Sequence, residues 1–177
     1  MRQSDSICAN KRTPNEFQAS LFQKIPAEKC STANALLCSP ICASFKMSAG
    51  WKNVSIEPGG VLDFSEEAIS NADTIQRIAA GQYLLSRPGA YLAQVQIAFV
   101  QAAQVIFSID GEERLDSVLG TSGEGGSIRG FCAFETEKAN TVLSICNPSQ
   151  SVRPIVVSLY TGGTLPVTSD LMIVRMR

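Results

Sequence analysis

The sequence predicts an all-β fold, an antiparallel jelly-roll sandwich of about ten short strands that follows a short helical N-terminal arm. From Ser44 onward, apolar and polar residues alternate with a period of two, and turn residues recur at intervals of roughly eight to twelve positions. Before Ser44 the apolar spacing is helical, and this stretch holds four of the six cysteines. We therefore divide the chain into an N-terminal arm, residues 1–43, and a jelly-roll domain, residues 44–177.

The arm contains a start signal and a stop signal for one helix, over residues 14–25. Thr13-Pro14-Asn15-Glu16 is a capping box with proline at the first helical position, and Pro26 ends the run. The apolar residues of this segment fall on one helical face: Phe17, Leu21, Phe22 and Ile25. An apolar stripe needs a covering surface, which is the chain's own domain, a neighbouring subunit or a docking partner.

The clearest strand of the domain begins at Tyr91, after which apolar residues alternate with mostly polar ones as far as Phe99. A second strand, Val105–Ile109, runs into Asp110-Gly111, a dipeptide typical of a tight hairpin turn, and Glu112–Leu119 returns beside it. Further strands are predicted at Phe45–Met47, Val54–Ile56, Val61–Phe64, Thr74–Ile78, Gln82–Leu85, Ile128–Phe134, Thr141–Cys146, Ile155–Tyr160 and Asp170–Met176. Long-range returns between so many short strands favour a jelly roll over a meander.

Two of the predicted strands are apolar on both faces. In the last one, Leu171 and Ile173 alternate with residues that are also apolar, and the strand that ends at Tyr160 is nearly as apolar. Because a sandwich buries only one face of each sheet, the second face needs a partner, and another copy of the chain is the simplest one. The candidates for a subunit interface are Tyr160, Leu171, Met172, Ile173 and Val174.

The cysteines of the arm are Cys8, Cys30, Cys38 and Cys42. Their spacing lacks the paired CxxC pattern of zinc sites and no histidine is present, so a zinc site is disfavoured. We favour disulfide cross-linking through the arm, with ordinary unpaired thiols as the close alternative. Cys132 and Cys146 lie inside strand-like runs, where we expect them to be buried as small apolar residues.

Composition excludes several classes of function. The chain of 177 residues has 15 Lys+Arg, 16 Asp+Glu and no His. Balanced charge without a basic cluster argues against nucleic-acid binding, and the missing histidine removes Ser-His-Asp, Cys-His and HExxH chemistry. We therefore expect no enzymatic activity and no cofactor. The sequence shows no secretory signal and no apolar run of the ~20 residues that a membrane helix needs, so we expect synthesis in the cytoplasm and no membrane insertion.

The densest acidic group lies at the Asp110-Gly111 turn and consists of Asp110, Glu112, Glu113 and Asp116. A solvated hairpin edge is the favoured interpretation, and a weak calcium site or the carboxylates of an enzyme are the alternatives. The glycine-rich segment Gly120–Gly126 is not followed by Lys-Ser/Thr and a helix, so we interpret it as a flexible loop and not as a phosphate-binding loop.

An ordered series of short motifs runs through residues 54–177. They are Gly59-Gly60-Val61-Leu62-Asp63-Phe64, Pro88-Gly89-Ala90-Tyr91-Leu92, Phe107-Ser108-Ile109-Asp110-Gly111, Val142-Leu143-Ser144-Ile145-Cys146-Asn147-Pro148-Ser149, Gly162-Gly163-Thr164 and Leu171-Met172-Ile173-Val174. In this order and spacing they resemble the trimeric jelly rolls of the tumour-necrosis-factor (TNF) and complement globular-head superfamily. The likeness is closest to the C-terminal domains of collagen-like exosporium proteins of spore-forming bacteria, although this chain has no Gly-X-Y stretch.

The resemblance implies a non-enzymatic structural protein of the spore surface, in the exosporium or coat. Such a protein forms homotrimers through the jelly roll, and here the arm is expected to link the trimers to other spore-surface or fibre subunits. The alternative is a receptor-binding or glycan-binding head of a phage or cell-surface fibre, because the same trimeric fold serves there.

Overall fold

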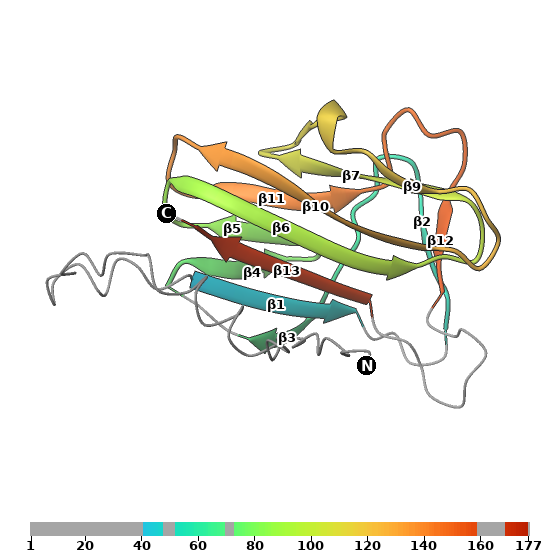
Figure 1. The fold of residues 1–177 in the computed structure, drawn as a ribbon, viewed down its shortest axis with the longest axis horizontal. Coiled ribbons are helices and arrows are strands. Elements are labelled where there is room, and N and C mark those ends of the chain that lie inside the picture. Colours follow the sequence, from blue (N-terminus) through green and yellow to red (C-terminus); the bar gives the residue numbers. More distant parts are fainter. Residues whose placement is uncertain (1–40, 48–51, 70–72, 159–168, 177) are drawn as a thin grey trace, which may run out of the picture. The chain divides into compact units, whose positions relative to one another are not determined.

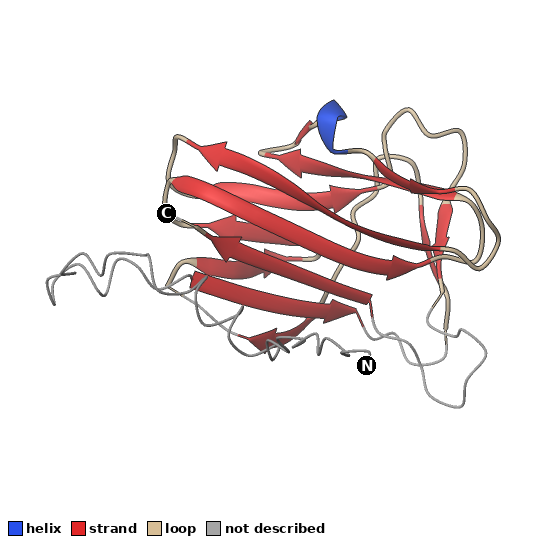
Figure 2. Cartoon of the chain, in the orientation of Figure 1, coloured by secondary structure: helices blue, strands red, loops and turns tan. Residues whose placement is uncertain are grey.

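The computed structural model describes residues 41–47, 52–69, 73–158 and 169–176. The chain divides between Leu37 and Cys38 into two units, and all described residues belong to the second. The helix predicted over residues 14–25 lies outside the described residues, as do Tyr160 and three of the four arm cysteines. Strands dominate the described part, whose only helical element is the short 3₁₀ turn η1, Leu115–Ser117 (Figure 2).

One layer of the sandwich is a five-stranded antiparallel sheet in the order β10-β6-β13-β1-β3 (Figure 1). Its strands are β10 (Ser127–Thr136), β6 (Gly89–Ala98), β13 (Ser169–Arg175), β1 (Ile41–Met47) and β3 (Glu66–Ile69). The last strand of the chain thus lies between β6 and β1, the first strand. Neighbours in the sheet that are distant in sequence are the long-range returns expected of a jelly roll.

The other layer has the order β4-β5-β11-β7-β8, with β9 also paired to β7. Its strands are β4 (Ile75–Ala79), β5 (Gln82–Leu85), β11 (Thr141–Cys146), β7 (Ala103–Ile109), β8 (Glu112–Glu113) and β9 (Leu119–Thr121). A separate two-stranded pair joins β12 (Ile155–Val157) to β2 (Val54–Ile56). All these pairings are antiparallel.

The core lies between the two sheets. Phe45 of β1 and Tyr83 of β5, both fully buried, bring their ring centroids to 4.7 Å. Along β6, Tyr91 and every second residue to Ile97 are buried in the same layer. Each large side chain removed from water in this way contributes about 1.5–3 kcal/mol, so the alternation seen in the sequence also drives the stacking of the sheets.

The predicted hairpin at Asp110-Gly111 is confirmed. β7 ends at Ile109 and β8 begins at Glu112, which leaves a two-residue turn. Asp110 has a φ of 51° and Gly111 a φ of 88°, so both occupy the left-handed region that such a turn requires. Beyond β8, the return continues through η1 into β9, which pairs with β7 again.

Two expected strand positions differ from the structure. Residues 61–64 form no strand, because Val61 makes only an isolated bridge to Cys146 while Leu62 and Phe64 are buried from an irregular segment. Leu62 and Phe64 are buried two positions apart, which gives the same sequence pattern as a strand although no ladder of backbone hydrogen bonds forms. The first strand begins at Ile41, so the expected boundary between residues 43 and 44 falls inside β1, and Cys42 belongs to the sheet.

Candidate functional site

The five-stranded sheet separates the interface candidates of the last strand onto two faces. Leu171 and Ile173 of β13 have no exposed surface and pack in the core. Met172 and Val174, between and after them, point to the outward face and are half-buried. The strand is apolar on both faces, as expected, but only Met172 and Val174 can contact another molecule, because a fully buried side chain offers no surface.

Cross-strand register shows which residues share the outward face. One row across β1, β13, β6 and β10 is Cys42, Val174, Leu92 and Ala133. The next row is Ser44, Met172, Gln94 and Phe131, and the one after it is Lys46, Asp170, Gln96 and Arg129. The outward face therefore changes from apolar at one end to charged at the other within three rows.

The apolar end forms what we call the face patch: Leu92, Phe131, Met172, Val174 and Met176. Phe131 is 66% exposed and Met176 is 54% exposed, so the two largest members face solvent in a single chain. A hollow of about 590 Å³ adjoins it, lined by Met176, Ala90, Ala133 and Phe134 and by the charged residues Arg114 and Glu135. Contiguous apolar surface of this kind on a sheet marks a protein contact more often than it marks free surface.

A second apolar feature lies along the β10 edge of this sheet. Leu119 of β9 packs against Gly130, where an added Cβ would lie 2.7 Å from the leucine methyl groups. A side chain at position 130 would therefore displace the Leu119 side chain from this contact. Val118, directly before Leu119 in the chain, is 42% exposed.

The outward face of the six-stranded sheet has a different character. A groove of about 830 Å³ lies over it, and we call it the acidic groove. Its floor is Ser108, Ser144 and Cys146, and its rim carries Asp110, Glu112 and Glu113. Three of the four acidic residues singled out in the sequence thus line one hollow, whereas Asp116 instead pairs with Arg114 at 2.8 Å.

The carboxylates of the rim have structural partners. Oδ1 of Asp110 accepts a hydrogen bond from the Val142 amide at 2.7 Å, which joins the hairpin turn to β11. Glu113 accepts from the amide and the hydroxyl of Ser149, at 2.7 and 3.1 Å. Within the described ranges, no group of three or more Cys, Asp or Glu side chains gathers as a metal site would require.

The described cysteines are free thiols on different faces. Cys42 is half-buried on the outward face of the five-stranded sheet, in the row of Val174. The prediction that Cys132 and Cys146 are buried is confirmed. Burial raises the pKa of Cys132, and burial together with Glu113 raises the pKa of Cys146 to about 11. These two thiols are therefore protonated and unreactive at neutral pH.

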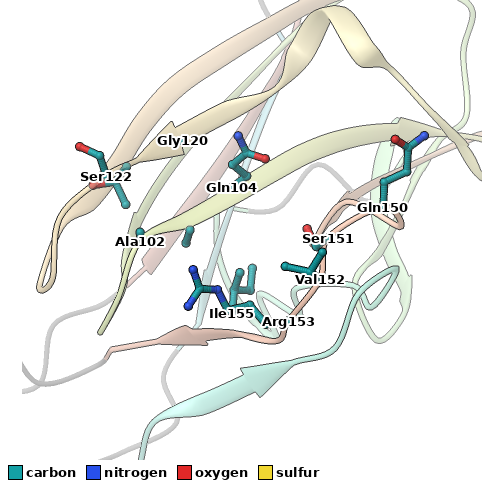
Figure 3. A pocket seen from close by; sticks show the side chains of 11 residues that line it. Ala102, Gln104, Gly120, Ser122, Gln150, Ser151, Val152, Arg153 and Ile155 are labelled. Carbon is teal, nitrogen blue, oxygen red and sulfur yellow. The ribbon is translucent and has the colours of Figure 1, made fainter.

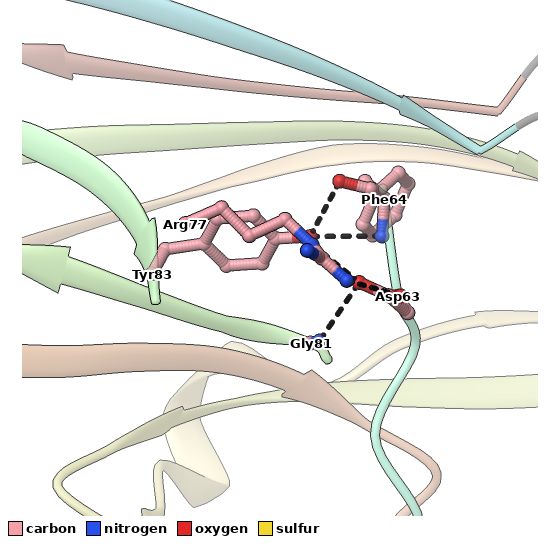
Figure 4. Close-up of polar contacts among 5 residues, drawn as sticks. All are labelled: Asp63, Phe64, Arg77, Gly81 and Tyr83. Atoms are coloured by element: carbon pink, nitrogen blue, oxygen red, sulfur yellow. Dashed lines mark hydrogen bonds and ion pairs between the residues drawn. The ribbon is translucent and has the colours of Figure 1, made fainter. Parts of the chain in front are cut away.

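A polar network fixes the irregular segment after β2 (Figure 4). Asp63 receives two hydrogen bonds from Arg77, at 2.9 and 2.6 Å, and a third from the Gly81 amide at 2.9 Å. Next to it, the Phe64 amide donates to the Tyr83 hydroxyl at 2.8 Å. Burial by itself raises the pKa of Asp63, but the bonds from Arg77 and Gly81 outweigh it, so the pKa lies below its ordinary value.

A further hollow of about 680 Å³, the loop pocket, lies between the start of β7, β9 and the segment before β12 (Figure 3). Its polar lining includes the side chains of Gln104, Ser122, Gln150 and Arg153. Sequence reasoning did not find this pocket, because its residues come from three separate segments.

Among the residues that the structure describes, no helix is long and apolar enough to cross a bilayer.

No family model matches the sequence, and no curated protein matches it. Solved structures do. The TNF protein Eiger from S. frugiperda is 17% identical, with a TM-score of 0.58 over 78% of this chain and 93% of that one. The globular domain of zebrafish complement 1qA is 10% identical, with a TM-score of 0.51 over 76% and 95%.

Murine APRIL is 13% identical, with a TM-score of 0.50 over 76% of this chain and 99% of that one. At such identities the likeness concerns the fold, and it extends over nearly the full length of each matched domain. The likeness to exosporium domains in particular stays a prediction from the sequence motifs. The described unit of this chain has the two-sheet jelly-roll fold of TNF and complement 1q globular domains.

Proposed function

We propose that this chain is a structural, self-assembling surface protein whose jelly-roll domain forms a homotrimer through the face patch. The observation that carries the proposal is the outward face of β13, where Met172 and Val174 occupy alternate positions and are half-buried, and no described strand packs over them. Phe131, in the row of Met172, and Met176, two positions after Val174, belong to the same patch and are more than half exposed. Covering these side chains in an assembly contributes about 25 cal/mol for each Å² of apolar surface removed from water.

The arrangement of the apolar surfaces favours a ring over a two-fold dimer. The face patch lies on a sheet surface, whereas Val118 and the β9–β10 contact lie at the sheet edge. When the edge of one copy packs on the face of the next, the contact is heterologous, and a rotation that closes makes a ring. The fold shared with TNF and complement 1q domains, which the sequence resemblance describes as trimeric, supports three copies.

A first experiment measures the mass of the assembly by light scattering. The expected mass is three times the 18.9 kDa of the chain. Met172→Asp should give a folded monomer, because it places a charge in the centre of the contact without touching the core. Val152→Asp is the matched control, since Val152 is 94% exposed on a loop and its variant should stay trimeric. A monomeric wild-type chain, or a trimeric Met172→Asp variant, would contradict the proposal.

We assign the trimer to the spore surface, in the exosporium or coat, and the N-terminal segment to its linkage with other subunits. The ordered motifs of the jelly roll and the four cysteines at residues 8–42 support this assignment. Localisation of a fluorescent fusion in sporulating cells tests it. Signal that stays diffuse in the mother-cell cytoplasm after the coat has formed would be the contrary result.

Cross-linking through the arm has a test of its own. A chain that begins at Ser39 keeps β1 complete and removes Cys8, Cys30 and Cys38. Denaturing electrophoresis without reductant should show a ladder for the full chain and for its Cys42→Ser variant, but none for the shortened chain. A ladder that survives the shortening would move the cross-link to the jelly roll.

The loop pocket favours a second candidate, a glycan-binding head. Amide, hydroxyl and guanidinium groups around one hollow are suited to sugar hydroxyls, and Gln104 and Arg153 come from different segments that the fold brings together. A glycan array probed with the trimer, and with Gln104→Ala and Arg153→Ala variants, tests this candidate. Signal that does not depend on these two residues would exclude the pocket as the binding site.

A further inference from the structure

The floor of the acidic groove on the six-stranded sheet includes two serines that are almost completely buried. Ser108 is only 4% exposed and Ser144 only 8%, and both line the groove. Their neighbours Phe107, Leu143 and Ile145 are fully buried in the core, so the pleat directs the two serines to the opposite, outward face. The two residues face each other across β7 and β11 in register.

These two hydroxyls have no protein partner among the described residues, in contrast to the buried Ser117, whose hydroxyl joins Arg114 and Phe107. Neither hydroxyl oxygen is among the fully enclosed polar atoms that lack a partner in the described part of the chain, so both can be reached from the groove by water or by a ligand. Placed at the bottom of a hollow, such groups are suited to hydrogen-bonding an incoming ligand.

The rim above the serines is acidic on one side. Glu113 lies opposite Ser108 in the β7–β8 pairing, and its carboxylate is held in place by Ser149. Glu112 and Asp110 continue the rim, and none of the described residues that line the groove is Lys or Arg. Each carboxylate oxygen keeps acceptor capacity beyond the bond it already makes. The groove therefore selects a positively charged ligand that donates hydrogen bonds.

The remaining lining includes the polar residues Gln82 and Ser149 and an apolar wall of Val61, Leu115 and Val142. Apolar side chains supply no ligands to a metal ion, and the described carboxylates do not converge on one point. A long alkyl chain that ends in an ammonium group fits both parts, because its methylene groups cover apolar surface while its N–H donors reach separated acceptors. The volume of about 830 Å³ lies within the usual range for a small-molecule pocket.

We propose that the acidic groove is a binding site for alkylammonium groups, with the ammonium held by Glu112, Glu113 and the serine floor and the alkyl chain lying against the apolar wall. The source of the group is a free polyamine or a lysine side chain of a partner. The groove is complete within one chain, so the site does not depend on the trimer.

Isothermal titration calorimetry of the full chain with spermidine and with 1,5-diaminopentane tests the site. Saturable binding with a millimolar or lower Kd is expected, at an ionic strength near 0.1 M that screens loose association. 1,5-Pentanediol is the neutral control ligand of the same length and should not bind. N-acetyl-lysine methylamide distinguishes the sources: a Kd equal to that of the diamine indicates a lysine side chain, and a Kd at least about tenfold weaker indicates a polyamine.

Variants assign the binding to the groove. Glu112→Gln with Glu113→Gln should weaken it by about tenfold or more, because hydrogen bonds to charged groups are lost. Ser108→Ala with Ser144→Ala should weaken it by about threefold to tenfold and leave the melting temperature unchanged or higher, since unpartnered hydroxyls are removed. Glu124→Gln with Glu137→Gln is the matched control: it also removes two negative charges, from exposed positions outside the groove, and should bind like the wild type.

Three results would overturn the proposal: no binding of either amine, equal weakening by the Glu124→Gln, Glu137→Gln control and the groove variants, or calcium binding that displaces the amines and needs the same carboxylates. Light scattering of the same samples reports the trimer separately, so a failed site and a failed assembly are distinguishable.

Discussion

The two sheets of this sandwich obey the same alternation, yet their outward faces differ in chemistry. On the five-stranded sheet, the face patch has Met172 and Val174 at alternate positions of β13, with Phe131 in the row of Met172. On the six-stranded sheet, the corresponding positions of β7 and β11 are Ser108 and Ser144 below a carboxylate rim. An apolar outward face requires a large covering surface, whereas a small polar hollow requires only a small ligand. The two proposals above therefore place assembly on one sheet and recognition on the other.

The largest expected effect separates core from face within β13. Ile173→Asp places a charge without a partner in the fully buried core, which should cost about 4 kcal/mol or more of the free energy of unfolding. Met172→Asp, one position earlier on the outward face, should leave a folded monomer. Urea unfolding of both variants, measured at concentrations where both are monomeric, checks this contrast. Equal losses of stability would mean that Met172 also serves the core.

The next effect tests whether the chemistry of the outward face controls association. Met172→Ser with Val174→Ser gives β13 the same small hydroxyls that line the floor of the acidic groove. The loss of two apolar contacts should weaken the trimer by about 100-fold or more, as measured by analytical ultracentrifugation. Ser108→Val with Ser144→Val makes the reverse change on the other sheet. It should not create a new oligomer, because the carboxylates of the acidic rim surround the two new valines and disfavour an apolar contact there. New association through that sheet would remove the distinction between the faces.

Much of the jelly roll could be predicted from alternation and turn chemistry. The strand from Tyr91 and the Asp110-Gly111 hairpin are confirmed because their signals are local: a period of two, and two residues that accept a positive φ. The strand at Leu171–Val174 could be predicted to be apolar on both faces. Which residues face the core could not, because that depends on where β1 and β6 pair with it.

The sites depend on contacts that no local pattern contains. Ser108 and Ser144 are far apart in the chain and meet only through the register of β7 and β11. The sequence does show the acidic cluster at the hairpin, but it cannot show that Glu113 accepts a hydrogen bond from Ser149 or that Asp116 forms an ion pair with Arg114. Likewise all four residues of β3, Glu66–Ile69, are exposed and show no alternation, so only its pairing with β1 makes it a strand.

A smaller effect compares the thiols of the two outward faces. Cys42 lies in the row of the face patch, and Cys146 lies on the floor of the acidic groove. In the monomeric Met172→Asp variant, Cys42 should react with iodoacetamide faster than Cys146, whose pKa of about 11 keeps it protonated. In the trimer Cys42 should be protected. Glu113→Gln removes a negative charge beside Cys146 and should speed its alkylation at pH 9 to 10. Mass spectrometry of the labelled peptides reports each rate, and a Cys42 that reacts equally in monomer and trimer would exclude it from the interface.

The smallest effect concerns the pair Asp63–Arg77, which connects the segment after β2 to β4 and the Gly81 turn. The pKa of Asp63 is lower in the folded chain than its ordinary value of 3.8, so the stabilisation is complete above that value and is lost as pH falls through the folded pKa. Asp63→Asn should therefore cost about 1 kcal/mol near pH 7, since the pair is partly exposed, and less near pH 2.5. Asp116→Asn is the control, because its pair with Arg114 lies within one exposed turn and joins no distant segments. Thermal melts of the three proteins between pH 7 and 2.5 measure the difference. A gap between wild type and Asp63→Asn that stays constant with pH would show that the geometry around Gly81, and not the charge of Asp63, provides the stabilisation.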